Sequence, residues 1–213
     1  MLDLVLLVAD KNMQFAVQGA LSRPEAMGIR PITYEFRSHP GRDGGVRASG
    51  SKVLARERNR FRHALMLLDF EGSGSSLLDP MALEQELDQE IRAYWNGNGK
   101  TIVISPEVDV WLWGSDNALQ EVFQWPLQET VRDFLRARGF EFSSDGKPVR
   151  PKEALEAMVP VHRQPRSSAL YEKVTNRISL QNCRDPAFLR LHQQLRIWFP
   201  RPASANCNSN EPA

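Results

Sequence analysis

Short runs of mostly apolar residues constrain the fold of this chain most strongly. Three of them have the length of a β-strand: Leu2–Ala9, Ala64–Asp69 and Thr101–Ser105. Strands that are apolar on both faces are typical of parallel sheets covered by helices on both sides. A further segment, Ile29–Phe36, is rich in β-forming residues and is predicted to be the second strand in chain order. Helical patterns separate the strands, so we expect an α/β fold with a mostly parallel sheet.

The predicted helices divide the chain into two parts. Those between the strands run from Asp10 to about Met27, from Val53 to Arg62 and from Met81 to Trp95. The breakers in Arg37–Ser51 predict a loop. Five more helices are predicted over Ser115–Phe123, Leu127–Ala137, Lys152–Met158, Ala169–Ile178 and Pro186–Phe199. We therefore expect an α/β core over residues 1–113, a C-terminal helical region over 114–199 that packs on it, and a polar, disordered tail over 200–213.

The composition excludes several classes of protein. Two cysteines, Cys183 and Cys207, provide neither a disulfide framework nor a cysteine-rich zinc site. The first residues lack the basic stretch of a signal peptide, and no apolar run approaches the ~20 residues that a membrane span needs. We expect a reduced, soluble, cytoplasmic protein.

The charged residues are balanced in number but segregated along the chain. Twenty-seven Lys and Arg residues face 26 Asp and Glu residues, and this balance argues neither for nor against a nucleic-acid partner. Residues 42–63 are strongly basic, whereas residues 79–90 are acidic. The basic side chains of Lys52, Arg56, Arg58 and Arg60 can contact nucleic-acid phosphates or form an ordinary solvated face, and the sequence leaves both interpretations open.

Carboxylates follow three of the four predicted strands. Asp69 and Glu71 are spaced i, i+2, so in an extended segment their side chains would point the same way just beyond the third strand. Asp10 follows the first strand, and Glu107 and Asp109 follow the fourth. In a parallel sheet all five would meet at the carboxyl edge, where ligands bind. They would repel one another unless a cation joined them, which predicts a Mg²⁺ or Mn²⁺ site.

Each of these residues also has a simpler interpretation. Asp10 can cap the following helix, while Glu107 and Asp109 can pair with Arg or Lys side chains. His39 is a candidate metal ligand or acid/base group, although its place in the loop that contains Arg42 favours a solvated histidine.

The chain resembles the Toprim-like proteins in short motifs that follow its predicted strands. These are the acid Asp10, the sequence D-F-E over residues 69–71 and the sequence P-E-V-D-V-W-L-W over residues 106–113. More narrowly, it is similar to a bacterial Toprim-like family related to the nuclease half of OLD-type (overcoming lysogenization defect) proteins. The C-terminal sequences K-E-A-L (152–155), A-L-Y (169–171) and C-R-D-P-A-F (183–188) are also similar. Members of that family often occur in antiphage defence clusters, including a methylation-associated defence system.

This resemblance implies a compact α/β fold with an acidic Mg²⁺ centre. The family places a glutamate after the first strand and Asp-x-Asp after the third. Asp10 takes the place of the glutamate, Asp69 that of the first aspartate and Glu71 that of the second. One acid is therefore shorter and another longer than in the family pattern. The resemblance makes these three residues candidate catalytic groups, and Lys11 or Arg42 can substitute for a lysine that some nuclease relatives use.

Three functions remain open from the sequence. The first is a Mg²⁺-dependent phosphodiesterase, a nuclease that acts on DNA or RNA. The second is a catalytically degenerate Toprim-like subunit of a defence complex, which would bind other defence proteins through the acidic helix Glu84–Glu90 and the last apolar helix. The third is a domain that binds a small molecule or a nucleotide without hydrolysing it.

Overall fold

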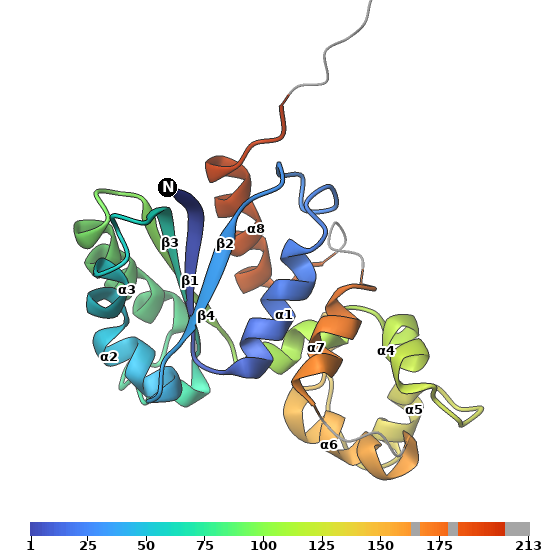
Figure 1. Cartoon of the computed structure of the whole chain (residues 1–213). Helices are drawn as coiled ribbons and strands as arrows, with labels where there is room; N and C mark the ends of the chain where they lie inside the picture. The colour runs from blue at the N-terminus through green and yellow to red at the C-terminus, as the bar shows by residue number, and fades with distance from the viewer. Residues whose placement is uncertain (163–166, 179–182, 203–213) are drawn as a thin grey trace, which may run out of the picture.

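The computed structural model of the chain describes residues 1–162, 167–178 and 183–202 (Figure 1). The described residues form a four-stranded, all-parallel sheet with the strand order β2-β1-β3-β4, which confirms the predicted α/β fold. The strands are β1 (Leu2–Val8), β2 (Tyr34–Ser38), β3 (Phe61–Asp69) and β4 (Gly99–Ile104). Of the tail predicted to be disordered, residues 203–213 lie outside the described part of the chain.

Helices cover both faces of this sheet. In Figure 1, α2 and α3 cover one face, and α1 and α8 cover the other. The helices between the strands are α1 (Lys11–Leu21), α2 (Arg42–Ala55) and α3 (Pro80–Tyr94). Two short 3-10 helices, η1 (Glu71–Ser73) and η2 (Val108–Gly114), follow β3 and β4. The C-terminal part consists of α4 (Asp116–Phe123), α5 (Val131–Arg136), α6 (Pro151–His162), α7 (Ser168–Thr175) and α8 (Pro186–Trp198).

The two central strands form the middle of the hydrophobic core. Residues 4–8 of β1 and 64–68 of β3 are at most 1% exposed. Strands buried on both faces have to be apolar in every position, which is why these segments are continuous apolar runs. Trp111 and Trp113 of η2 extend the core beyond the end of β4.

The sequence misplaced two elements around the second strand. The strand begins at Tyr34 rather than Ile29, and α2 starts at Arg42, inside the segment predicted to be a loop. Glycines in this helix have a packing role that outweighs their low helix propensity. A Cβ atom on Gly50 would lie 2.4 Å from Sδ of Met66 and 3.1 Å from Cδ2 of Leu7, so glycine favours the close approach of α2 to the sheet.

The basic helix predicted over Val53–Arg62 is also wrong. Helix α2 ends at Ala55, a turn follows, and β3 begins at Phe61. Phe61 is 1% exposed. Its ring is buried in the sheet, so the chain enters β3 at this residue, although the charge pattern predicts a helix as far as Arg62.

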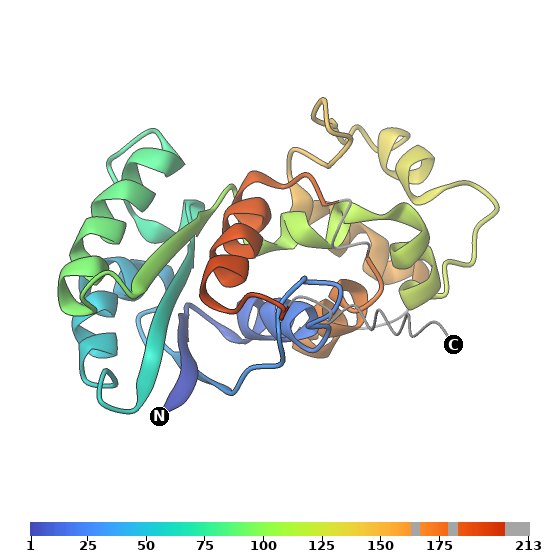
Figure 2. The same cartoon turned by 90° about the horizontal axis from the view of Figure 1, so that it is seen from above.

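The C-terminal helices pack directly on the α/β part. Helix α7 lies along α1, where a Cβ on Gly19 would be 2.0 Å from Oγ1 of Thr175 (Figure 1). Helix α8 lies against β4, between the sheet and the other C-terminal helices in Figure 2. Arg190 of α8 holds the buried carboxylate of Glu84 in α3 with two hydrogen bonds of 2.8 Å. Glu84 therefore stabilises the interior, although the sequence suggested an acidic docking face there.

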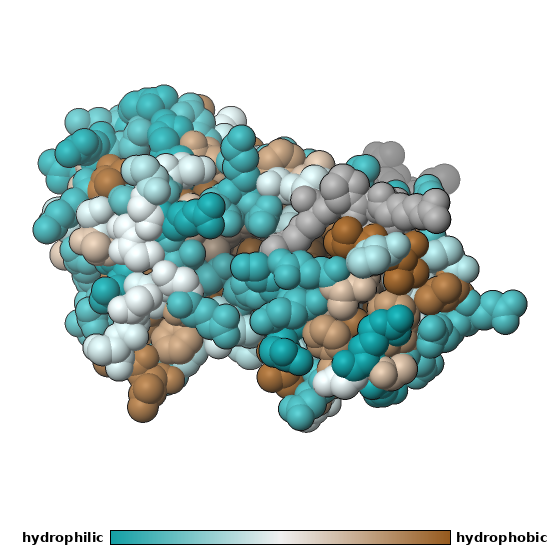
Figure 3. Space-filling model, turned by 90° about the horizontal axis from the view of Figure 1, so that it is seen from below, coloured by the Kyte–Doolittle hydropathy of each residue, from teal (hydrophilic) through white to brown (hydrophobic). Residues whose placement is uncertain are grey.

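The carboxyl ends of the strands face the viewer in Figure 3. The surface over the α/β part is mostly hydrophilic, whereas hydrophobic residues gather over the C-terminal helices. None of the helices in the described part of the chain combines the length and the hydropathy that crossing a bilayer requires.

Candidate functional site: an acidic pocket at the carboxyl edge of the sheet

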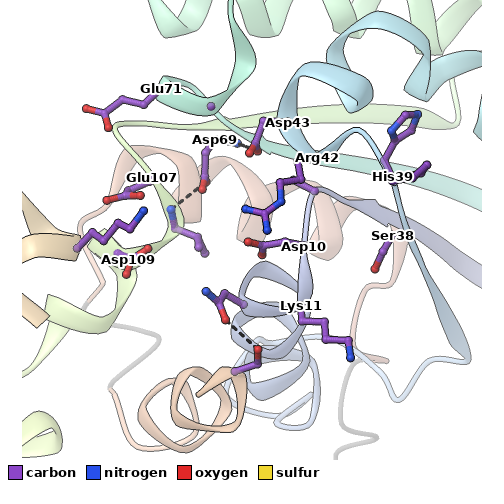
Figure 4. Close-up of a pocket in the computed structure, with 17 residues that line it drawn as sticks. Asp10, Lys11, Ser38, His39, Arg42, Asp43, Asp69, Glu71, Glu107 and Asp109 are labelled. Atoms are coloured by element: carbon purple, nitrogen blue, oxygen red, sulfur yellow. Dashed lines mark hydrogen bonds between the residues drawn. The ribbon is translucent and has the colours of Figure 1, made fainter. Parts of the chain in front are cut away.

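The order of the strands creates a crevice between β1 and β3. After β1 the chain crosses to β2 on one side, and it later returns to β3 on the other side. In open α/β sheets ligands bind at this switch point, outside the carboxyl ends of the strands. A pocket of about 830 Å³ lies there. Its acidic lining residues are Asp10, Asp43, Asp69, Glu71, Glu107 and Asp109, and its basic ones are Lys11, His39, Arg42 and Lys152 (Figure 4).

Asp69, the last residue of β3, is the centre of the acidic group. Its Oδ1 accepts a hydrogen bond of 2.8 Å from the backbone N–H of Val108, which holds the chain after β4 against the end of β3. Burial raises the pKa of Asp69 well above the usual range, and the neighbouring carboxylates of Asp43, Asp109, Glu107 and Asp10 raise it further. A nearby cation would therefore strongly stabilise the ionised form of the Asp69 carboxyl group.

Asp43 is the site residue that the sequence analysis missed. Its Oδ1 accepts a hydrogen bond of 2.7 Å from the backbone N–H of Asp69, and burial raises its pKa. A Cβ on Gly72 would lie 2.4 Å from Oδ2 of Asp43, so glycine is needed where the chain passes this carboxylate. Asp43 lies in the first turn of α2, and a correct prediction of that helix start would have placed it beside the strand ends.

Asp10 combines two roles that the sequence presented as alternatives. Its Oδ1 accepts a hydrogen bond of 2.9 Å from the N–H of Met13 and so caps α1, as predicted. In Figure 4 its carboxylate also faces the same cavity as Asp69.

Glu71 does not lie beside Asp69 in the way that the i, i+2 spacing predicted. Strand β3 ends at Asp69, and Phe70 has helical angles (φ −64°, ψ −48°), so the extended geometry on which the prediction depended is absent here. Glu71 begins η1 and is exposed, and Figure 4 shows its side chain directed away from Asp69. The structure gives Asp69 a different close acidic neighbour, Asp43.

The two acids after β4 line the pocket from its other side. Asp109 is 2% exposed, and its Oδ1 accepts a hydrogen bond of 2.7 Å from the hydroxyl of Tyr171 in α7. Glu107 lies just before η2 and lines the same cavity (Figure 4). The C-terminal helices therefore contribute to the position of these acids.

Arg42 reaches the pocket from an unusual backbone conformation. Its φ of +49° is in the left-handed region, which costs a non-glycine residue about 1 kcal/mol or more. Figure 4 shows its side chain directed toward Asp10 and Asp43. The sequence identified Arg42 as a substitute for a catalytic lysine, and the structure places it among the acids.

His39 uses both ring nitrogens inside the protein. Nδ1 accepts a hydrogen bond of 3.0 Å from the N–H of Gly41, so the ring proton of the neutral form is on Nε2, 3.0 Å from Oγ of Ser49. His39 therefore supports the start of α2, and both of its ring nitrogens are engaged in hydrogen bonds within the protein. Lys11 lies on the pocket rim, and its side chain extends away from the acids in Figure 4.

The basic segment singled out in the sequence lies far from these acids. Lys52 is in the last turn of α2, and Arg56, Arg58 and Arg60 lie in the turn that leads into β3. That turn is at the amino edge of the sheet, because β3 ends at the pocket. Arg60 forms ion pairs with Glu57 and Glu35 there, at 2.9 and 3.3 Å.

The chemistry of the pocket fits a hard divalent cation, although the site is not assembled. Within the described residues, no three Asp, Glu, His or Cys side chains already converge as metal ligands. Asp10, Asp43 and Asp69 nevertheless present carboxylates from three chain segments to one cavity. Oxygen ligands of this kind suit Mg²⁺ or Mn²⁺, and side-chain rotation would be required to bring them onto one ion.

Comparisons of the sequence and structure with protein-family models, with curated proteins and with solved structures gave no match.

Proposed function

We propose that this chain is a Toprim-like, Mg²⁺- or Mn²⁺-dependent nuclease that acts in antiphage defence in the bacterial cytoplasm. The acidic pocket at the switch point between β1 and β3 is the observation that supports a metal-dependent reaction. The sequence resemblance supports the assignment to defence.

The roles of the side chains follow from their positions. Asp10, Asp43 and Asp69 would hold the cation, which supplies an activated water and stabilises the departing oxygen when it is bound. Arg42, which extends toward the same acids, would bind a phosphate oxygen of the substrate. The hydrogen bond from the backbone N–H of Asp69 to Oδ1 of Asp43 holds the Asp43 carboxylate at the end of β3 before substrate arrives.

A specific observation favours the alternative of a catalytically degenerate subunit. Glu71, which takes the place of the second family aspartate, is exposed and directed away from Asp69. Such a subunit would bind other defence proteins without cutting nucleic acid. Glu84 of the acidic helix is buried, so the docking surface in that case would be the exposed Leu189 and Ile197 of α8.

Two measurements test the nuclease proposal. Calorimetric titration with Mg²⁺ and with Mn²⁺ should detect binding in the wild type and its loss in Asp69→Asn and Asp43→Asn. Incubation with single- and double-stranded DNA and RNA should show cleavage that EDTA stops. Absence of divalent binding at millimolar concentration would refute the proposal, whereas metal binding with every substrate intact would favour the degenerate subunit.

Glu71→Gln is the informative control. The family pattern assigns a metal ligand to this position, whereas the exposed orientation of Glu71 predicts a small effect on binding. Asp43, which the pattern does not include, is expected to be essential. A reversed result would show that η1 rearranges when the metal binds.

A further inference from the structure

Arginine side chains cover aromatic rings on the C-terminal part of the chain. The guanidinium of Arg138 lies 3.5 Å from the centre of the Phe134 ring, and that of Arg150 lies 5.3 Å from the centre of the Phe140 ring. Arg136 lies 5.3 Å from the centre of the Phe142 ring. We call these three arginines and their rings the Arg–Phe surface.

The Arg–Phe surface is open to solvent and positively charged. Arg136, Arg138 and Arg150 are all exposed, and residues 131–152 contain six Lys or Arg residues against three Asp or Glu residues. Two of the three acidic residues in this segment each lie near one basic side chain. Asp133 lies 3.6 Å from Arg136, and Asp145 lies 3.6 Å from the buried Lys147.

A short hairpin holds this surface in place. Ser143 N–H donates to the carbonyl of Lys147 at 2.8 Å, and Val149 N–H donates to the carbonyl of Glu141 at 3.0 Å. Gly146 takes a φ of +78° in the turn, which suits glycine. These backbone hydrogen bonds therefore hold the backbone on either side of the turn, including that of Phe142, in place.

A buried ion pair joins the hairpin to the wall of the acidic pocket. Nζ of Lys147 lies 3.1 Å from Oδ2 of Asp185, and Oδ1 of Asp185 accepts a hydrogen bond of 2.9 Å from Nε1 of Trp111 in η2. Val108 at the start of η2 donates to Asp69, so η2 connects the hairpin to the acids.

The surface also continues to the rim of the pocket along the chain. Lys152, in the first turn of α6, lines the acidic pocket. It is two residues from Arg150, so their Cα atoms are no more than about 7 Å apart. Arg136, Arg138, Arg150 and Lys152 therefore supply positive charge on the chain segment that leads to the pocket rim.

We propose that the Arg–Phe surface binds a single strand of nucleic acid and directs it past Lys152 into the acidic pocket. This inference rests on the proposed nuclease function and names the surface that holds its substrate. Guanidinium groups bind phosphates with directed hydrogen bonds, and these planar groups can also stack on bases. Positive charge combined with such planar groups is typical of surfaces that bind single strands.

Fluorescence anisotropy with a labelled oligothymidylate of about 16 nucleotides, in EDTA, tests binding without cleavage. The triple variant Arg136→Ala/Arg138→Ala/Arg150→Ala should bind at least about tenfold more weakly than the wild type. Loss of three phosphate contacts should also reduce the slope of log K against log salt by about 2. The matched control Arg56→Ala/Arg58→Ala/Arg60→Ala removes the same charge from the opposite edge of the sheet and should bind like the wild type.

Because Arg138 also packs on the buried Phe134 ring, a second variant avoids that contact. Arg136→Glu/Arg150→Glu changes two exposed side chains, and circular dichroism should show the wild-type fold with oligothymidylate binding abolished. Equal binding by this variant and the wild type would overturn the inference. So would a loss confined to the Arg56/Arg58/Arg60 variant, or no binding by the wild type.

An acidic protein is the competing occupant of a basic surface. If polyglutamate displaces the labelled oligonucleotide as effectively as unlabelled oligothymidylate does, the assignment to nucleic acid is overturned. The nuclease proposal has a separate test. Asp69→Asn should lose cleavage and keep binding, and a wild type that binds the strand in EDTA but never cuts it with Mg²⁺ would contradict the nuclease proposal alone.

Discussion

The backbone N–H of Asp69 donates a hydrogen bond of 2.7 Å to Oδ1 of Asp43, so the end of β3 is held by the first turn of α2. This contact joins the end of β3 to the start of α2, and the order of the strands alone does not predict that these two segments meet. It also places a second carboxylate beside Asp69, whose own pKa is already raised by burial. The electrostatic behaviour of the pocket therefore depends on Asp43.

Replacement of Asp43 by Asn should lower the pKa of Asp69. The amide oxygen of Asn can still accept the Asp69 N–H, while the negative charge that raises the Asp69 pKa is removed. Titration of the Asp69 carboxyl carbon by NMR in EDTA measures the change. Glu71→Gln serves as the control, since the exposed Glu71 is directed away from Asp69. Equal shifts in the two variants would contradict the arrangement of the pocket.

The contribution of Asp69 to the stability of the metal-free protein should fall as pH rises. The folded-state pKa of Asp69 lies above its unfolded value of about 3.9, so the folded state holds more protons between these two pKa values. Unfolding free energy then decreases through that window, by up to about 1.4 kcal/mol per pH unit for this group. Urea unfolding in EDTA at several pH values should show a weaker decrease for Asp69→Asn.

A divalent cation should reverse this pH dependence. A metal bound to ionised Asp69 stabilises the folded state, and proton competition for the carboxylate is weakest at high pH. Millimolar Mg²⁺ should therefore raise the melting temperature more at pH 8 than at pH 5. Identical shifts at both pH values would indicate nonspecific salt effects in place of binding at the pocket.

The ion pair between Arg190 and Glu84 should be important for stability. Glu84 is 1% exposed, accepts hydrogen bonds from Arg190 and from the N–H of Val103, and lies 3.5 Å from Nζ of Lys100, so removal of the guanidinium leaves a buried charge with weaker partners. Arg190→Met should cost about 3 kcal/mol of unfolding free energy. The control Arg92→Met removes an exposed arginine that pairs with Asp88, and Asp88 keeps its ion pair with Lys100, so this variant should cost less than about 1 kcal/mol. Chemical denaturation with urea distinguishes the two, and equal costs would refute the role of this pair.

The sequence predicted the sheet well and the pocket only in part. Strands β1, β3 and β4 could be recognised because burial on both faces requires continuous apolar residues, and this signal is local. The cap formed by Asp10 was equally local. The start of α2 was missed because Gly44, Gly45 and Gly50 lower helix propensity, whereas the close contacts of Gly45 with His39 and of Gly50 with Met66 depend on the tertiary structure.

The error at Glu71 has the same origin. The spacing of Asp69 and Glu71 indicates a shared face only while the strand continues, and the helical angles of Phe70 end it one residue too early. Likewise, the sequence showed the positive charge of Arg56, Arg58 and Arg60. Their distance from the acids of the pocket depended on where α2 ended. Local patterns identified the charged groups, and tertiary structure determined which of them meet.

Two neighbouring glycines in α2 provide a test of this packing. A Cβ on Gly45 would lie 2.1 Å from Nδ1 of His39, whereas a Cβ on Gly44 would lie 3.8 Å from its nearest neighbour, the backbone oxygen of Ser73. Gly45→Ala should therefore displace the His39 ring and destabilise the protein by about 1–3 kcal/mol. Gly44→Ala should be neutral or stabilise it by up to about 1 kcal/mol, because alanine favours the helix. Urea unfolding gives the energies, and ¹⁵N spectra of His39 should show the loss of its Nε2–H tautomer in Gly45→Ala alone. Equal stability of the two variants would mean that His39 does not pack on α2.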